Sequence, residues 1–169
     1  MPDEFRTDFI AIIEALSRHG VRFVLIGGLA MRMHGSSHET DDLDVVYARD
    51  PANLKAVVDA LTSSSPRLRV RDGEIPFLWD TVTLQRGLNF TLRTDIGDVD
   101  LLGEAAGAPD FQQLWDCSTQ FDVEGNPVHV ASIDALISMK QAANRTKDQL
   151  HILELQALKK LLEEGAEQA

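Results

Sequence analysis

The feature that most constrains the fold is the apolar run 21–26, which is followed directly by Gly27-Gly28. A short apolar run that ends at glycine is typical of a buried strand, and a buried strand needs neighbouring elements to cover it. The glycine pair turns the chain into a short segment, 29–34, that we expect to be helical. Before the strand, apolar residues recur at helical spacing from Phe5 to Leu16, and His19-Gly20 ends that helix.

The rest of the chain alternates between helices and strands. In order, we expect a strand around 43–46, a helix beginning at Pro51, several short strands from Arg67 to Leu102, an amphipathic segment around 111–115 and a hairpin of 120–123 with 128–131. One helix then follows Ser132, and a last helix opens at Thr146 with Gln149 at capping-box spacing. The residues of the last helix expected to face inward are Leu150, Leu153, Ala157, Leu158 and Leu161.

This order of elements indicates an α/β or α+β fold with a mixed sheet, and we take it as α+β. Residues 1–131 are expected to form the core, and residues 132–169 a C-terminal helical pair packed on it. The length of 169 residues fits a single domain of this kind.

Composition narrows the class of protein. The chain carries 16 Lys and Arg against 27 Asp and Glu, so its formal net charge is −11. This charge argues mildly against a broad basic surface for nucleic acid, but not against a local one. No apolar run approaches the ~20 residues that a membrane helix needs, and the acidic start lacks the order of a secretory signal. A single cysteine, Cys117, excludes an internal disulfide and a multi-cysteine zinc site. We therefore expect a cytoplasmic protein with no membrane partner.

Two aspartates on the second strand are the first candidates for chemistry. Because residues two apart on a strand share a face, Asp42 and Asp44 project together while Leu43 and Val45 face the core. Adjacent carboxylates repel each other unless a cation lies between them, and their hard oxygens suit Mg²⁺ or Mn²⁺. The glycines of 27–28 lie where a strand meets a helix N-terminus, at which backbone N–H groups favour phosphate. A phosphate-binding turn beside a carboxylate metal site is what nucleotidyl transfer needs. Taken separately, the glycine pair is more often a tight turn, and the aspartate pair a solvated edge or a cap.

A third aspartate comes from a later strand. Acidic and apolar residues alternate in 98–102 after a turn at Ile96-Gly97, so Asp98 and Asp100 share one face. If this strand lies beside the second one, Asp100 completes a two-metal site that binds the attacking and leaving oxygens. Asp98 lies nearer the turn and is more simply explained as solvated. The alternative is that both acids are surface charges.

Several of these motifs occur in an order that resembles the polymerase-β-like nucleotidyltransferases: a strand ending in Gly-Gly, an Asp-hydrophobic-Asp strand and a later hydrophobic-Asp-hydrophobic strand. The chain is more closely similar to the minimal AbiEii-type nucleotidyltransferases. That similarity rests on Gly27-Gly28-X-Ala30, His34-Gly35, Thr40-X-Asp42-Leu43-Asp44, Gly97-X-Val99-Asp100-Leu101-Leu102 and Lys140-X-X-Ala143-X-Arg145-X-Lys147-Asp148. It covers nearly the whole chain, from Val21 to about Leu158.

The resemblance implies a nucleotidyltransferase fold and metal-dependent transfer of a nucleoside monophosphate from a nucleoside triphosphate. It assigns Asp42, Asp44 and Asp100 to catalysis and to the binding of Mg²⁺ or Mn²⁺, with Asp100 as the candidate base for the acceptor proton. The residues expected to bind the nucleotide are Gly27, Gly28, Thr40, Lys140 and Lys147. The two lysines can instead hold the C-terminal helices in place. Many relatives have an arginine at the position of His38, and this departure bears on triphosphate binding and on catalytic rate.

The resemblance also implies an acceptor and a biological setting. The acceptor is expected to be an RNA such as a transfer RNA, or a protein, in a toxin–antitoxin or phage-defence system with a cognate partner. The competing hypothesis is a non-catalytic nucleotide-binding or antitoxin-like interaction module that keeps the fold. A distance separates the two hypotheses, since two metal ions can bridge the aspartates only if Asp100 lies within about 8 Å of Asp42 and Asp44.

Three arginines alternate in the segment 67–71, at Arg67, Arg69 and Arg71. Alternation on a strand places them on one face. The simpler interpretation is that the arginines form a solvated sheet edge that resists aggregation. The more specific alternative is that they form a strip that contacts phosphate. His34 and His38 flank the loop before the aspartates, where a polar loop role is simpler than contact with substrate.

Overall fold

The apolar run predicted as a buried strand is β1 (Phe23–Ile26), in which every residue is buried. The other strands are β2 (Asp42–Tyr47), β3 (Arg67–Leu68), β4 (Asn89–Thr94), β5 (Gly97–Leu102), β6 (Thr119–Val123) and β7 (Asn126–Val130). They form one seven-stranded sheet of order β3-β4-β5-β2-β1-β7-β6 in a computed structural model that describes residues 4–167. Because β1 is antiparallel to β2 and parallel to β7, the sheet is mixed, which confirms the predicted fold class.

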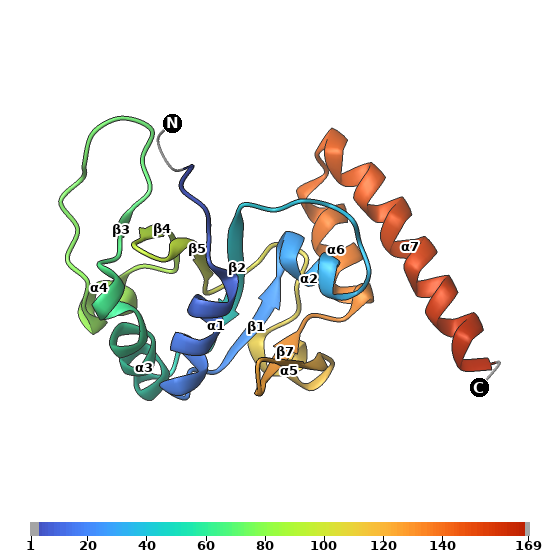
Figure 1. Cartoon of the computed structure of the whole chain (residues 1–169), viewed down its shortest axis with the longest axis horizontal. Helices are drawn as coiled ribbons and strands as arrows, with labels where there is room; N and C mark the ends of the chain where they lie inside the picture. Colours follow the sequence, from blue (N-terminus) through green and yellow to red (C-terminus); the bar gives the residue numbers. More distant parts are fainter. Residues whose placement is uncertain (1–3, 168–169) are drawn as a thin grey trace.

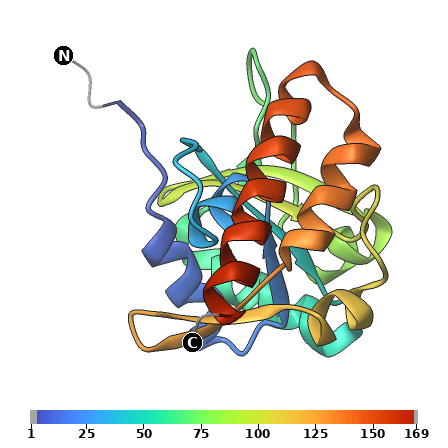
Figure 2. The same cartoon turned by 90° about the vertical axis from the view of Figure 1, so that its right-hand side faces the viewer.

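Helices surround this sheet (Figure 1). They are α1 (Phe9–Arg18), α2 (Gly27–Met33), α3 (Pro51–Leu61), the 3-10 helix η1 (Thr62–Ser64), α4 (Thr81–Arg86), α5 (Phe111–Asp116), α6 (Ile133–Ala143) and α7 (Thr146–Glu167). Side-chain oxygens cap the first turns of α1, α3, α4, α5 and α6, and the capping residues are Asp8, Asp50, Asp80, Asp110 and Ser132. The predicted C-terminal pair is present, with α6 and α7 side by side in Figure 2. None of the helices in the described range is both long and apolar enough to cross a membrane.

The register of the central strands brings acidic residues into line. β2 pairs in parallel with β5, so that Asp42 lies opposite Asp98 and Asp44 lies opposite Asp100. The residues that alternate with these acids are fully buried: Leu43, Val45, Val99 and Leu101. One face of this part of the sheet therefore forms the core, and the other face carries the carboxylates.

The middle of the chain differs from the predicted series of short strands. β3 has only two residues, residues 69–80 form neither helix nor strand, and α4 occupies part of the segment that was expected to be a strand. Two contacts explain the difference. The indole Nε1 of Trp79 donates to the carbonyl of Val58 on α3 (3.0 Å), and Asp80 caps α4, so this segment is fixed against α3 and not in the sheet.

The predicted inward face of the last helix is wrong for Leu150, Leu153, Ala157 and Leu161, and it is right for Leu158, which is partly buried against the core. Leu150, Leu153 and Leu161 are 72%, 63% and 63% exposed, and α7 is buried instead at Asp148 and Leu155. The rotation of α7 follows from its first turn, where Asp148 accepts from the backbone N–H of Arg145 (3.0 Å) and forms an ion pair with α6. Asp148, and not the exposed Gln149, therefore makes the capping contact, and its burial turns the leucines outward.

Candidate active site

Three aspartates converge on the polar face of the sheet. Asp42 and Asp44 come from β2, and Asp100 comes from the neighbouring β5. One carboxylate oxygen from each lies within 4.8 Å of the others, so these three residues could hold a metal ion. This spacing is well inside the limit that separated the two hypotheses from sequence.

Burial and like charge act on these carboxylates together. Burial, followed by the negative charges of Asp42 and Asp100, raises the pKa of Asp44 to about 8. Burial and the charge of Asp100 also raise the pKa of Asp42, against the opposing effect of Arg69. Carboxylates that resist ionisation in the protein alone gain from a divalent cation, and three hard oxygen donors suit Mg²⁺ or Mn²⁺. The donor set therefore fits the Mg²⁺ or Mn²⁺ that the resemblance implies.

The glycine pair allows α2 to begin directly against β2. Gly27 has φ +69°, a left-handed conformation, and a Cβ at this position would overlap the carboxylate of Asp44. A Cβ at Gly28 would lie 2.7 Å from the Cβ of Thr40, whose hydroxyl donates to the backbone carbonyl of Asp42 (3.2 Å). The two glycines are thus required by close packing at the site, beyond the needs of a tight turn.

A cleft of about 470 Å³ lies over the carboxylates. All eight residues assigned from the sequence line it: Gly27, Gly28, Thr40, Asp42, Asp44, Asp100, Lys140 and Lys147. The carboxylates belong to the sheet, and the two lysines belong to α6 and α7. The cleft therefore combines an anionic wall, suited to a metal ion, with cations suited to phosphate.

Lys140 and Arg145 are tied to a buried carboxylate next to the cleft. Asp148 has no exposed surface, and its oxygens lie 2.8 Å from Nε of Arg145 and 3.4 Å from Nζ of Lys140. The hydrogen bonds from Arg145, together with the charge of Lys140, hold the pKa of Asp148 well below its usual range. Lys140 thus joins α6 to α7 and also lines the cleft, while the exposed Lys147 lines it as well.

The histidines divide between the cleft and the scaffold. His34 hydrogen-bonds to the carbonyl of Ala131 (2.8 Å) and does not line the cleft. His38 lines the cleft beside His151, with the ring centroids 4.3 Å apart. Burial and the charges of Lys140 and His38 lower the pKa of His151. Its sequence position gave no sign of the cleft, because α7 brings it there only through tertiary packing.

Two residues have contacts that the sequence did not indicate. Asp98, expected to be solvated, accepts two hydrogen bonds from Arg93 (2.9 and 3.0 Å) and is mostly buried. Arg69 reaches the carboxylates of the site, while Arg67 pairs with Asp95. The three alternating arginines therefore do not form one phosphate-contacting strip, because β3 ends at Leu68 and Arg71 is exposed beyond it.

Comparisons with known proteins bear on the fold of the chain. No family model matches the sequence, and the comparison with curated proteins gives no match. Among solved structures, an antigenic nucleotidyltransferase-like protein from Paracoccidioides brasiliensis is similar with a TM-score of 0.53, at 15% identity over 90% of this chain and 73% of that chain. A nucleotidyltransferase candidate from Thermotoga maritima gives a TM-score of 0.49, at 16% identity over 90% of this chain and 89% of that one. The antibiotic-resistance factor ANT(2'')-Ia gives 0.42, at 14% identity over 94% and 95% of the two chains. By the first of these likenesses, the chain has the nucleotidyltransferase fold.

Proposed function

We propose that the chain is a metal-dependent nucleotidyltransferase that transfers a nucleoside monophosphate from a nucleoside triphosphate to an acceptor. The observation that carries this proposal is the meeting of Asp42, Asp44 and Asp100 in one cleft with Gly27-Gly28 and the lysines. A cluster of acids alone would not suffice. Here the acids share the cleft with the first residues of α2 and with two lysines, and backbone N–H groups and cations of this kind bind phosphate.

The residues divide the chemistry between them. Asp42, Asp44 and Asp100 would hold Mg²⁺ or Mn²⁺, which supplies charge stabilisation to the attacking and leaving oxygens when it is bound. The backbone of Gly27-Gly28 and the hydroxyl of Thr40 would bind the triphosphate from the sheet side. Lys140 and Lys147 would neutralise its charge from the helical side of the cleft.

The transfer itself exchanges one bond for another. The acceptor oxygen forms a bond to the α-phosphorus, and the bond from that phosphorus to the β-phosphate bridging oxygen breaks, so pyrophosphate leaves. The acceptor proton would pass to the carboxylate of Asp100, which lies on the strand beside Asp44. The resemblance to AbiEii-type proteins supports an RNA, such as a transfer RNA, or a protein as the acceptor. It also supports a role in a toxin–antitoxin or phage-defence system.

A second candidate function is nucleotide binding without catalysis. The contact that favours it is the guanidinium of Arg69, which lies 2.6 Å from Asp100 and thus already compensates part of the negative charge. In that case the cleft would bind a nucleotide but would not transfer its monophosphate.

Transfer from α-labelled nucleoside triphosphates to total RNA and to total protein tests the proposal. We expect label in one of the two fractions only when Mg²⁺ or Mn²⁺ is present. Asp44→Asn should reduce it on the order of 10²- to 10³-fold, as the loss of one preorganised electrostatic contact does in other active sites. Asp41→Asn is the matched control, because Asp41 lies three residues before Asp44 and is exposed but lies outside the cleft.

The same assay separates the two candidate functions. Metal-dependent nucleotide binding with no labelled product in either fraction would favour the non-catalytic module. Equal transfer by the wild type and Asp44→Asn would contradict the proposed metal site, since the reaction would then not depend on Asp44.

A further inference from the structure

A guanidinium lies among the carboxylates of the proposed metal site. Nη2 of Arg69 is 2.6 Å from Oδ1 of Asp100 and 3.6 Å from Oδ2 of Asp42, and Nη1 is 3.4 Å from Oδ2 of Asp98. The Arg69 side chain is 21% exposed, so these contacts are partly shielded from water. Two of the three candidate metal ligands therefore already have a cationic partner that belongs to the chain itself.

The sheet delivers this side chain to the site. The backbone N–H of Arg69 donates to the carbonyl of Thr91 (2.9 Å), which continues the β3–β4 pairing by one residue. Thr91 lies opposite Asp100, and Asp100 lies opposite Asp44. Because partners across a sheet point to the same face, the Arg69 side chain passes over β4 toward the two aspartates.

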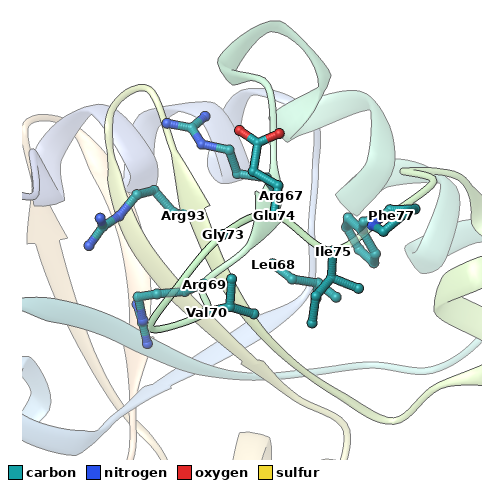
Figure 3. Close-up of a pocket in the computed structure, with 10 residues that line it drawn as sticks. Arg67, Leu68, Arg69, Val70, Gly73, Glu74, Ile75, Phe77 and Arg93 are labelled. Carbon is teal, nitrogen blue, oxygen red and sulfur yellow. The ribbon is translucent and has the colours of Figure 1, made fainter.

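The neighbouring arginines are directed elsewhere. Figure 3 shows Arg67, Arg69 and Arg93 extending to one side of the hollow beside β3, while Leu68 and Ile75 lie on the other side. Arg67 pairs with Asp95 (3.1 Å), and Arg93 binds Asp98 with two hydrogen bonds. Of these three arginines, only Arg69 touches Asp42 or Asp100.

We propose that Arg69 is a built-in counter-cation that competes with the divalent metal ion for Asp42 and Asp100. In the metal-free protein it holds the carboxylates together, and the metal must displace its guanidinium to bind. Arg69 is thus a positioning residue that sets metal affinity. This inference rests on the proposed function, since it needs the three aspartates to be metal ligands.

Two properties of the site support displacement over a permanent ion pair. The guanidinium brings one positive charge to the three candidate ligands, while Asp98 has its own partner in Arg93, so part of the repulsion that a divalent ion would relieve is still present. The chain leaves the sheet immediately after Arg69 and forms no regular element until α4. A change of side-chain rotamer then releases the guanidinium into the hollow that Arg69 also lines, without breaking the β3–β4 pairing.

Mn²⁺ binding without nucleotide tests the competition directly. We would titrate the wild type, Arg69→Gln and the control Arg67→Gln, and measure free Mn²⁺ by electron paramagnetic resonance. Arg69→Gln should bind Mn²⁺ at least about tenfold more tightly, since a charge-assisted contact is worth roughly that factor in an equilibrium constant. Arg67→Gln should match the wild type, because its partner Asp95 lies outside the site.

The thermal midpoint in chelator supplies a second readout. Removing the guanidinium leaves the aspartates without their cation, so Arg69→Gln should unfold at a lower temperature than the wild type and regain more of its midpoint on adding Mn²⁺. If the glutamine variant does not fold, Arg69→Lys gives the same comparison. Its ammonium cannot bridge two carboxylates in the same plane, so Mn²⁺ affinity should rise a few-fold.

Weaker or unchanged Mn²⁺ binding in both Arg69 variants would overturn the proposed competition. The proposed metal site would still stand if the wild type binds Mn²⁺ and Asp44→Asn does not. If neither the wild type nor the Arg69 variants bind Mn²⁺, the proposed metal site is wrong and this inference fails with it. A variant that is destabilised and also binds Mn²⁺ less tightly would show that Arg69 only supports the fold.

Discussion

Asp44, which is partly buried, and Asp148, which is fully buried, are two aspartates with opposite electrostatic surroundings. Asp148 has no exposed surface and is held by Arg145 and Lys140, which lower its pKa. Asp44 lies beside two further carboxylates, and its pKa is raised to about 8 by burial and by those charges. The first arrangement stabilises the folded chain at neutral pH, whereas the second opposes folding. A carboxylate whose surroundings destabilise the folded chain is best explained by a divalent cation, whose charge the single guanidinium of Arg69 does not replace.

The largest expected change in stability is at Asp148. Asp148→Asn keeps the shape of the side chain but leaves Arg145 and Lys140 without their anion. The free energy of unfolding should fall by about 3 kcal/mol, as when one partner of a buried ion pair is removed. Thermal unfolding at pH 7 measures the loss, and the midpoint should drop roughly 2–4 °C for each kcal/mol.

Asp134→Asn is the matched control for Asp148→Asn. Asp134 also pairs with a lysine across α6 and α7, but its side chain is 70% exposed, so its loss should change stability by less than about 0.5 kcal/mol. Because the low pKa of Asp148 stabilises the fold above pH ~4 and this contribution is lost below it, the two variants should converge in stability toward acid pH. Equal midpoints at pH 7 would show that the Asp148 network contributes nothing to stability.

A smaller loss is expected at the other aspartate site. Gly27→Ala introduces a methyl group at a left-handed position and against the carboxylate of Asp44. The strain should cost about 1–3 kcal/mol, and the displaced Asp44 should also weaken Mn²⁺ binding. Gly125→Ala is the control, because Gly125 has a similar positive φ but open space where its Cβ would lie. If both alanine variants bind Mn²⁺ as the wild type does, the close approach of Gly27 to Asp44 is not part of the site.

Asp44→Asn should change stability in the opposite direction. In the metal-free protein the free energy of unfolding should rise by about 1 kcal/mol at pH 8, because one of the repelling charges is removed. This value corresponds to roughly one pKa unit. The pH dependence gives the sharper test. The pKa of Asp44 is higher in the folded chain than in the unfolded chain. Its contribution to the free energy of unfolding is therefore fully present below pH ~4 and is lost as the pH rises to about 8.

Thermal midpoints in chelator between pH 5.5 and pH 8.5 measure this dependence. The wild type should lose stability relative to Asp44→Asn across this range. A strong loss of stability in Asp44→Asn would identify Asp44 as a structural residue, and the contrast with Asp148 would disappear.

The smallest effect on stability concerns the residue that belongs to both regions. Lys140→Gln leaves Asp148 with Arg145, so the free energy of unfolding should fall by only about 0.5–1 kcal/mol. Nucleotide binding should weaken much more, because Lys140 lines the cleft. Lys159→Gln is the control, since Lys159 also joins α7 to α6, through Asp134, but lies outside the cleft. Calorimetric titration with a nucleoside triphosphate and Mg²⁺ should separate the two lysines. Equal affinities would limit Lys140 to holding the helices together.

The aspartate cluster could be placed from the sequence because it depends on local geometry. The two-residue period of a strand puts Asp42 beside Asp44, and only the pairing of β2 with β5 had to be assumed to add Asp100. The glycine pair was equally local. Arg69 could not be assigned, because alternation on an edge strand gives its face but not the neighbour that its long side chain reaches.

The last helix shows the limit of periodicity. Leu150, Leu153 and Leu161 do share one face, as their spacing predicts, but the helix is rotated so that this face is exposed. A buried aspartate fixed to α6 determines that rotation, and a pattern of apolar residues carries no information about it. Trp79 acts similarly in the middle of the chain, where one hydrogen bond to α3 takes the segment away from the sheet.

The parallel pairing of β2 with β5 has a consequence for how the chain folds. Asp44 and Asp100 are far apart in the sequence, and the helix α3, the strands β3 and β4 and the helix α4 all lie between them. The loop-closure entropy of that long segment must be overcome before the two carboxylates meet, so their repulsion arises only once the centre of the sheet has formed. A metal ion that binds there would recognise the completed sheet and not the unfolded chain, and would stabilise the native state by mass action.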